Sequence, residues 1–312
     1  MTSRRPARSN ANQAKLPSDA LDWLHRHVQA TSPVEVTRQR PWSTVARTTD
    51  ADGVVWFKAC APVQAFEPRL TAGLSDRWPD RVPEVIAWNE NDAWMLLRDA
   101  GVLLRQHGNP PEVWLQVLPR YSELQRGEAA RVAEHLAVGV PDLRVETLPA
   151  KLPELLQHEL PFDSGAAAKV ERFASTFAGW CEELAAHGIP ASIQHDDLHH
   201  GNVYLDDGRT RVLDWGDSSI SHPFASAVVT FRFLEQINGL PPDDPWFARL
   251  RDAYLEPWGS GLTEVFDLAV RVGRFAHAIA WIKQRQAVPV AERATFDEEY
   301  ARVLRRAVAV IP

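Results

Sequence analysis

The sequence contains few cysteines: only Cys60 and Cys181 occur among 312 residues. They do not stand in a CxxC or similar spacing, so neither a zinc ribbon nor a disulfide framework is expected. Each has apolar neighbours and is predicted to be a small buried side chain. No run of about 18 apolar residues is present either, so the sequence predicts no membrane span.

An excess of positive charge is also missing. The formal net charge is −7 and the pI is about 5.9, which argues against nucleic acid as a partner because nucleic acid favours a basic face. The acidity is compatible with a cationic ligand, although it serves solubility in many proteins. Residues 1–17 start with a basic stretch that has no apolar segment behind it, so we expect a disordered tail rather than a secretory signal. We expect a cytoplasmic protein by default, and no protein partner is implied.

Apolar residues, in contrast, are plentiful. The hydrophobic content of 45%, with twelve Trp and twelve Phe, is enough for a sizeable core in one large domain or two lobes. Residues 18–97 combine helical segments with β-prone runs and predict an α+β lobe, whereas residues 98–312 have mainly helical periodicity. Strands are expected at 34–40, 44–49, 54–59, 82–88 and 93–99, and helices at 18–30, 64–74, 113–124, 127–140, 170–187, 263–284 and 292–310.

One stretch interrupts the helical half. Residues 193–217 read IQHDDLHHGNVYLDDGRTRVLDWGD. Residues 203–205 and 211–213 alternate around a DDG turn and predict a small hairpin, in which Asp206 and Asp207 are turn residues without a chemical role. Histidines and carboxylates at this density fit a zinc site, a magnesium-dependent phosphoryl-transfer site or a polar loop.

A zinc site would require His195 and His199, four residues apart, to share one face of a helix. The intervening and following residues include DD and GN, which are poor helix formers, and Pro190 lies just upstream. No cysteine is near enough to complete a soft ligand set. The residues therefore disfavour zinc.

Phosphoryl transfer requires a carboxylate that orients the attacking hydroxyl and hard oxygen ligands that hold Mg²⁺ on the phosphates. Kinases provide an Asp, an Asn five residues later, and a metal-binding Asp after a hairpin. Asp197 and Asn202 have this spacing, and Asp214 lies just past the predicted hairpin. Asp196 is six residues from Asn202, so the spacing selects Asp197 and leaves Asp196 without a role.

The combined pattern HxDLHxxN and hydrophobic-DW resembles the aminoglycoside phosphotransferase family, relatives of the choline kinases within the protein-kinase-like fold. Every position of it is matched, by His195, Asp197, Leu198, His199, Asn202, Leu213, Asp214 and Trp215. The resemblance implies a two-lobed α+β fold, with a nucleotide-binding N-lobe at 18–97 and a helical C-lobe at 98–312. It implies ATP and Mg²⁺ as cofactors, Asp197 as the residue that orients or deprotonates the acceptor hydroxyl, and Asn202 and Asp214 as magnesium ligands.

The resemblance also implies a nucleotide site in the N-lobe. Lys58 lies inside the apolar run VVWFKA and would hold the α- and β-phosphates, with Glu67 as the charged partner that a lysine in this setting needs. The glycine-rich loop of protein kinases is missing, so the Ser43 hydroxyl or neighbouring backbone N–H groups are expected to contact phosphate. Backbone groups from Leu97 to Asp99 are expected to bind the adenine.

The remaining polar residues of the stretch receive supporting roles. His195 and His199 are expected to brace the loop, and His200 to be polar surface. Asp217 is expected either to meet a cationic group of the substrate or to be solvated.

The sequence has no DFG or APE motif and no room for an activation loop, so we expect a small-molecule hydroxyl acceptor. Aminoglycoside, macrolide, choline-like, sugar and amino-alcohol acceptors all stay open, as does a catalytically silent nucleotide-binding module.

Overall fold

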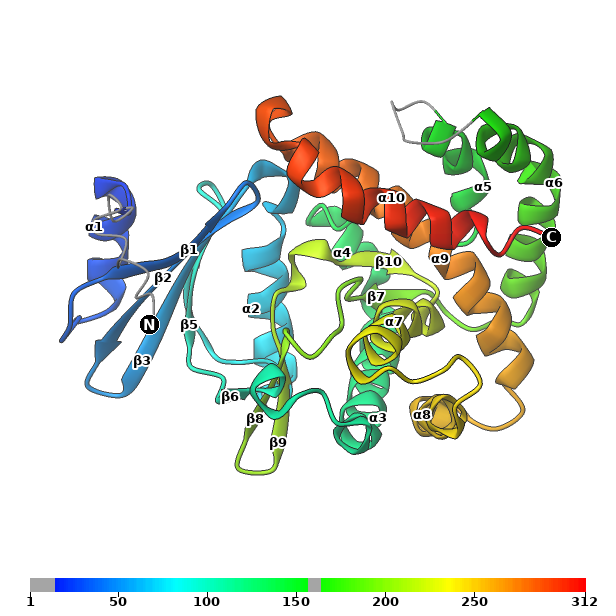
Figure 1. Cartoon of the computed structure of the whole chain (residues 1–312). Helices are drawn as coiled ribbons and strands as arrows, with labels where there is room; N and C mark the ends of the chain where they lie inside the picture. The colour runs from blue at the N-terminus through cyan, green and yellow to red at the C-terminus, as the bar shows by residue number, and fades with distance from the viewer. Residues whose placement is uncertain (1–14, 157–163) are drawn as a thin grey trace, which may run out of the picture.

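The computed structural model describes residues 15–156 and 164–312. The expected tail at 1–17 therefore lies mostly outside the described residues, although Leu16 is buried in the core of the N-terminal lobe. The described part forms a smaller lobe around an antiparallel sheet and a larger helical lobe (Figure 1). No helix within these two ranges is long and apolar enough to cross a membrane.

The N-terminal lobe contains a five-stranded antiparallel sheet in the order β1-β2-β3-β5-β4. Side chains alternate between its two faces. On one face, Val55 and Phe57 of β3 pack against Trp23 and Leu24 of helix α1. Helix α2 lies between the sheet and the helical lobe (Figure 1). The elements are α1 (Ser18–His27), β1 (Glu35–Arg40), β2 (Ser43–Asp50), β3 (Gly53–Cys60), α2 (Glu67–Arg77), β4 (Val85–Asn89) and β5 (Trp94–Arg98).

These elements agree with the predicted order, with one shift at α2. The helix expected to begin at residue 64 begins at Glu67, after a short 3-10 turn at Pro62–Gln64. Proline is favoured in the first turn of a helix, and Pro68 occupies that position. Glu67 is the first residue of α2, and its side chain pairs with Lys58 of β3.

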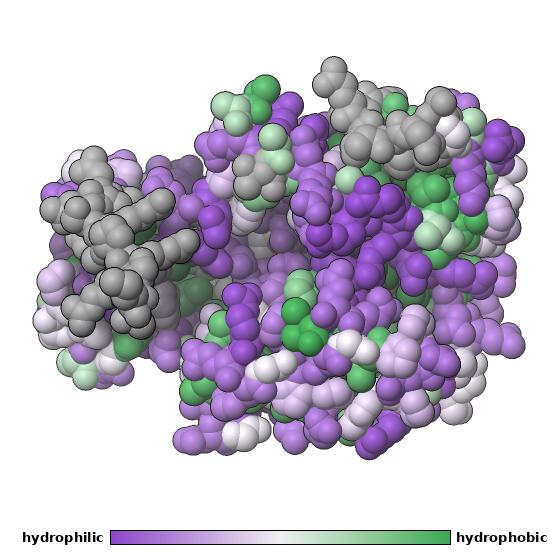
Figure 2. Space-filling view, viewed as in Figure 1, coloured by the Kyte–Doolittle hydropathy of each residue, from purple (hydrophilic) through white to green (hydrophobic). Residues whose placement is uncertain are grey.

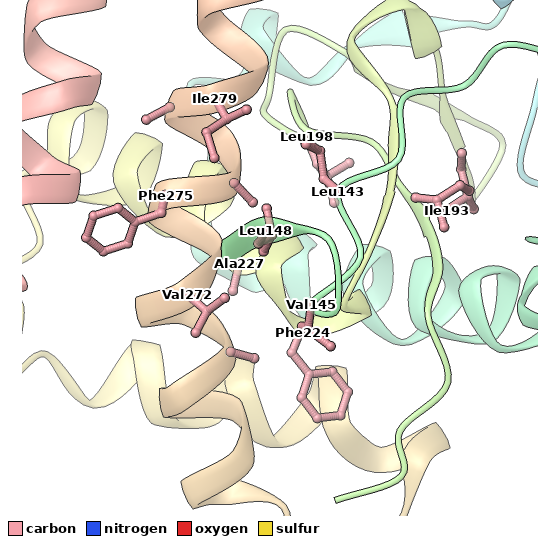
Figure 3. Packing of buried hydrophobic residues seen from close by; sticks show 14 of the residues in the cluster. Leu143, Val145, Leu148, Ile193, Leu198, Phe224, Ala227, Val272, Phe275 and Ile279 are labelled. Atoms are coloured by element: carbon pink, nitrogen blue, oxygen red, sulfur yellow. The ribbon is translucent and has the colours of Figure 1, made fainter. Parts of the chain in front are cut away.

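The helical lobe packs around one extended apolar core. The inward faces of its long helices supply Phe177, Val272, Phe275 and Ile279, and Figure 3 shows the last three side by side on one helix. Its helices are α3 (Pro111–Glu128), α4 (Val132–Ala137), α5 (Leu148–Lys151), α6 (Ser164–Ala186), α7 (Ala227–Asn238), α8 (Pro245–Leu255), α9 (Thr263–Ala287) and α10 (Ala294–Val308).

The helix expected over residues 127–140 is present in part but is not one continuous helix: α3 continues through Gly127 to Glu128, a 3-10 turn follows at Ala129–Arg131, and α4 ends at Ala137. A Cβ at position 127 would lie 2.3 Å from the Trp78 ring. The glycine therefore does not end the helix but makes room for the Trp78 ring of the other lobe.

Two small sheets position the loop at residues 195–202. Strand β7 (Ser192–Gln194) precedes the loop and pairs with β10 (Ser219–Ser221). Strands β8 (Val203–Asp206) and β9 (Arg209–Val212) follow as the predicted hairpin, and β8 also pairs with β6 (Val102–Leu103). Both ends of the loop are thus fixed by strands.

Candidate active site

Asp197 lies in the loop between β7 and β8 and is held by two neighbours. Asn202 donates from Nδ2 to the Asp197 carboxylate at 3.0 Å and to its backbone oxygen at 2.9 Å. His199 Nε2 lies 3.2 Å from the Asp197 Oδ2 atom. The Asp197 side chain remains 31% exposed, so it can meet a molecule in the adjacent cavity.

His195 connects this loop to the segment that carries Asp214. Its Nε2 atom lies 2.8 Å from the backbone oxygen of Leu213, and its Nδ1 atom accepts from the Asp197 N–H at 3.2 Å. Burial lowers the pKa of His195, which keeps the ring neutral and able to act as donor and acceptor at once. The contacts agree with the bracing role expected for His195.

Asp214 lies two residues after the end of β9 and has a left-handed backbone conformation, with φ of 67°. Such a conformation is uncommon for a residue with a side chain but is tolerated best by Asp and Asn. Asp214 lies 2.5 Å from the Lys58 Nζ atom and 3.5 Å from the Arg38 guanidinium. Burial alone would raise the pKa of Asp214, but the charges of Lys58 and Arg38 lower it overall.

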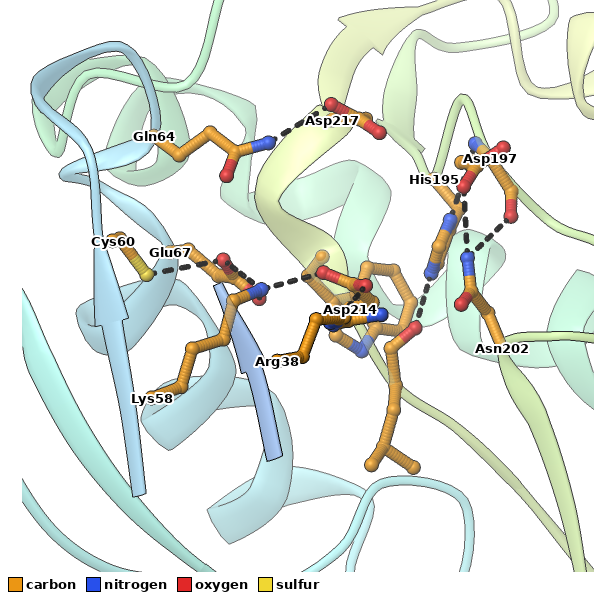
Figure 4. A network of polar contacts seen from close by, with 12 residues as sticks. Arg38, Lys58, Cys60, Gln64, Glu67, His195, Asp197, Asn202, Asp214 and Asp217 are labelled. Carbon is orange, nitrogen blue, oxygen red and sulfur yellow. Dashed lines mark hydrogen bonds and ion pairs between the residues drawn. The ribbon is translucent and has the colours of Figure 1, made fainter. Parts of the chain in front are cut away.

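The expected ion pair between Lys58 and Glu67 is present. Lys58 Nζ lies 2.6 Å from the Glu67 carboxylate, and both side chains are almost completely buried. Burial alone would lower the pKa of Lys58, but the carboxylates of Asp214 and Glu67 raise it above its usual value. Figure 4 shows Lys58 between the two carboxylates.

Asp217 is held at the same junction by two amides. Gln64 Nε2 and Gln284 Nε2 both donate to Asp217 Oδ1, at 3.0 and 2.6 Å. Burial raises the pKa of Asp217 well above its usual range, and the carboxylates of Asp197 and Asp214 raise it further. Gly216 is needed beside it, because a Cβ there would lie 2.6 Å from the Glu67 carboxylate. Asp217 is thus partly buried and held by hydrogen bonds from both lobes.

Three residues differ from their sequence-based interpretation. His200 is buried, not surface, and its ring lies 5.5 Å from Phe233. Asp196 is also buried, receives hydrogen bonds from Ser219 and Gln194, and has its pKa raised by burial to about 7; it fastens the loop to β7 and β10. Cys60 is only partly buried and donates to Glu67 at 3.2 Å.

Two cavities meet at these residues. A cavity of about 250 Å³ lies below the sheet, and its lining includes Lys58, Glu67 and Leu97. A second cavity of about 240 Å³ lies on the side of α9 and α10, and its lining includes Asp197, His199 and Asp217. Both cavities are lined by Arg38, Gly201, Asn202 and Asp214. Figure 2 shows this face of the molecule hollowed where the two lobes meet. We call them the sheet cavity and the helix cavity.

Ser43 and Asp99 line neither cavity. The Ser43 hydroxyl is buried and has no hydrogen-bond partner within the part of the chain that the structure describes. Asp99 accepts from Trp56 Nε1 at 2.8 Å. Arg38, on the strand before the segment that was expected to contact phosphate, lines both cavities instead.

The donor set suits a hard cation better than zinc. Among residues 15–156 and 164–312, no group of three or more His, Cys, Asp and Glu side chains is arranged to hold a metal. Asn202 and Asp214 line both cavities and offer amide and carboxylate oxygens, which Mg²⁺ accepts while taking its remaining ligands from phosphate and water. The pair fits a metal that arrives with a nucleotide.

A partly exposed carboxylate beside an amide, a second carboxylate after a hairpin, and a lysine–glutamate pair under an antiparallel sheet together define a kinase-like phosphotransferase site. The family profile described as "Phosphotransferase enzyme family" (APH) matches residues 58–266. The chain belongs to this family. No significant match is found among curated proteins.

Solved structures of the same fold include enzymes of several kinds. The GDP complex of an aminoglycoside 2'-phosphotransferase-IIIa has 14% identity and a TM-score of 0.61, with 94% of this chain and 97% of that chain covered. A choline/ethanolamine kinase family protein from Mesorhizobium loti has 16% identity and a TM-score of 0.55, with coverage of 91% and 90%. Amicoumacin kinase hAmiN in complex with AMP-PNP, Ca²⁺ and Ami has 10% identity and a TM-score of 0.58, with coverage of 93% and 94%. At these identities the likeness shows the kinase-like fold.

Arg38, Gln64 and Gln284 are site residues that the sequence did not indicate. Arg38 follows an irregularity in the pairing of β1 with β2, between Val36 and Arg38. A bulge of this kind redirects a side chain, and it has no local sequence signature. The two glutamines are visible only through their shared contact with Asp217.

Proposed function

We propose that this protein transfers the γ-phosphate of ATP to a hydroxyl group of a small molecule, with Mg²⁺ as cofactor. The observation that carries the proposal is the position of Asn202 and Asp214 at the junction of the sheet cavity and the helix cavity. Lys58 lines only the sheet cavity and Asp197 only the helix cavity. A donor in one cavity and an acceptor in the other would therefore meet at the junction.

The residues of the sheet cavity would bind the nucleotide. Lys58 would neutralise the α- and β-phosphates, and its buried ion pair with Glu67 holds it in place. Backbone groups near Leu97 would bind the adenine. Asn202 and Asp214 would hold Mg²⁺, which supplies positive charge to the phosphate oxygens.

Asp197 would act on the acceptor. Its carboxylate would accept or orient the proton of the attacking hydroxyl, while Asn202 and His199 fix its direction. His195 would keep Asp197 and the Asp214 segment in register.

An amino group on the acceptor is supported by Asp217. This partly buried carboxyl group lines the helix cavity together with Trp42 and Trp281. A cationic amino group would favour its ionised form, because burial and neighbouring carboxylates otherwise oppose ionisation.

The test is a comparison of Asp197→Asn with the wild-type chain on a panel of hydroxyl compounds, measured by release of nucleoside diphosphate. We expect the acceptor-dependent rate to fall by roughly 100-fold or more, since general-base contributions are of this size. Asp207→Asn is the matched control, because it makes the same Asp-to-Asn substitution at an exposed residue of the hairpin turn.

Retention of the full rate by Asp197→Asn would contradict the assignment of Asp197. A wild-type chain that binds ATP but shows no acceptor-dependent release across the panel would instead favour the silent nucleotide-binding module.

A further inference from the structure

A third cavity, of about 490 Å³, lies between α7, α8, α9 and α10. We call it the arginine cavity, after the residues that include Arg232 of α7, Arg274 of α9 and Arg306 of α10. None of the residues proposed to bind the nucleotide, Mg²⁺ or the acceptor hydroxyl lines this cavity.

The arginine cavity and the helix cavity are lined by neighbouring turns of α9 and α10. His277 lines both. On α9, Val270 and Arg274 lie on the arginine side of His277, and Trp281 and Gln284 on the other. Residues three or four apart share one face of a helix, so a single face of α9 lines both cavities. The same holds for α10, where Phe296 and Tyr300 line the helix cavity and Val303 and Arg306 the arginine cavity.

Positive charge in the arginine cavity is incompletely paired. Arg232 is only 5% exposed, its nearest carboxylate oxygen belongs to Glu299 at 3.7 Å, and its Nε atom has no hydrogen-bond partner among the described residues. Arg274 is half-buried, and the described ranges give it no carboxylate oxygen within 4.0 Å. Burial lowers the pKa of Arg274, and Glu235 offsets this only in part. A buried cation without full pairing is costly, and a bound anion relieves that cost.

The carboxylates of the same cavity are used elsewhere or lie at its mouth. Glu235 pairs with Arg306 at 3.3 Å. Asp244 accepts from the Trp246 N–H at the start of α8. Asp243 and Asp267 are exposed to solvent.

His277 can bridge the two cavities. It is 5% exposed, and neither ring nitrogen has a partner among the described residues. Burial and the nearby charge of Arg232 lower its pKa to about 3. The neutral ring therefore offers one donor and one acceptor to a molecule that passes it.

We propose that the arginine cavity is a subsite for an anionic group, a carboxylate or a phosphate, on the acceptor whose hydroxyl lies at Asp197. The proposal rests on the proposed function for the position of that hydroxyl. Arg232 and Arg274 bind the anionic group, and His277 contacts the acceptor between its two ends. The acceptor class is a hydroxyl compound that carries an acidic group, which is recognised independently of the amino group proposed at Asp217.

The test measures binding to the full-length, nucleotide-free chain by calorimetry, so it does not depend on turnover. The probes are two pairs that differ by one anionic group: gluconate against glucitol for a carboxylate, and glycerol 3-phosphate against glycerol for a phosphate. The variant is Arg274→Gln, which leaves Glu235 paired with Arg306. The control is Arg305→Gln, an exposed arginine on α10 that lines none of the three cavities.

We expect the anionic member of at least one pair to bind the wild-type chain about tenfold or more tightly than its uncharged counterpart, as for hydrogen bonds to charged groups. The preference disappears in Arg274→Gln and persists in Arg305→Gln. Equal binding within both pairs, or a preference that survives Arg274→Gln, overturns the proposal.

The two proposals fail separately. If the preference depends on Arg274 but no hydroxyl compound is phosphorylated, the subsite stands and the proposed function fails. If hydroxyl compounds are phosphorylated without any preference for the anionic members, the proposed function stands and the subsite fails.

Discussion

Arg38 reaches Asp214 from the first strand of the sheet, where no glycine-rich loop is available to cover phosphates. Its guanidinium lies 3.5 Å from the Asp214 carboxylate, and its side chain is 48% exposed. Because it lines both the sheet cavity and the helix cavity, it is placed to turn toward a phosphate group at their junction. Arginine pairs with phosphate through two parallel hydrogen bonds.

We therefore predict that Arg38→Gln raises the KM for ATP by roughly tenfold, the lower range for a half-exposed charged contact. The kcat is expected to change much less, because Asp197 and Asn202 are untouched. Steady-state kinetics on the variant give both values. Arg40→Gln, an exposed arginine on the same strand, is the control, and an unchanged KM for Arg38→Gln contradicts the phosphate contact.

At the scale of elements, α2 is joined to α3 by a buried carboxylate. Glu128 of α3 is 1% exposed and receives hydrogen bonds at 2.7 Å from Arg77, the last residue of α2, and from Trp78, which follows it. His135 Nε2 lies 2.8 Å from the same carboxylate. Burial alone would raise the pKa of Glu128, but these hydrogen bonds lower it to about 2.

A carboxylate with a lowered pKa in the folded state stabilises that state fully above its unfolded pKa, near 4.5. The stabilisation is lost as the pH falls from about 4.5 toward 2. We predict that Glu128→Gln lowers the free energy of unfolding at pH 7 by roughly 3 kcal/mol, the size expected for breaking a buried ion pair. It should also flatten the decline of stability in acid.

Urea denaturation at a series of pH values measures both effects. Glu123→Gln is the matched control, because Glu123 lies on the same helix and its ion pair with Arg81 has a half-exposed carboxylate. Equal losses in the two variants would contradict a special role for Glu128.

The elements that could be predicted from the sequence were those with strong periodicity or turn chemistry. The apolar spacing of Val265, Leu268 and Val272 predicted α9, and the DDG turn predicted the hairpin of β8 and β9. The passage of α3 through Gly127 could not be predicted, because it depends on Trp78 of another lobe.

The candidate site divides in the same way. Asp197, Asn202 and Asp214 were predicted from their local spacing, and the structure brings them to one junction. Arg38 was missed because its direction depends on the pairing of β1 with β2. His200 was assigned to the surface because its packing against Phe233 arises only in the folded lobe.

At the scale of the whole molecule, the two lobes meet through the pair of Lys58 with Asp214 and the bond of Gln64 with Asp217. A nucleotide bound with Mg²⁺ would add contacts to both lobes and so stabilise the folded chain. At 100 times its dissociation constant a ligand adds about 2.7 kcal/mol, which is roughly 5 °C in Tm for a chain of this size.

We predict that Mg²⁺ together with ATP raises Tm more than ATP with a chelator, and that Asp214→Asn removes the difference. Asn is chosen because it also tolerates the left-handed backbone at this position. Differential scanning fluorimetry on wild type, Asp214→Asn and the turn control Asp207→Asn measures it. The same magnesium-dependent increment in Asp214→Asn and wild type would exclude Asp214 as a ligand.

Helix α2 is held at both ends. Glu67 at its start binds Lys58, and Arg77 at its end binds Glu128. In kinases the position of the helix that carries the lysine's partner determines whether the enzyme is active. Here that helix is bound to the helical lobe, so contacts within the chain itself hold Lys58 in position. We therefore expect a constitutively assembled enzyme. Its rate would depend on the concentrations of nucleotide and acceptor rather than on a separate activation step.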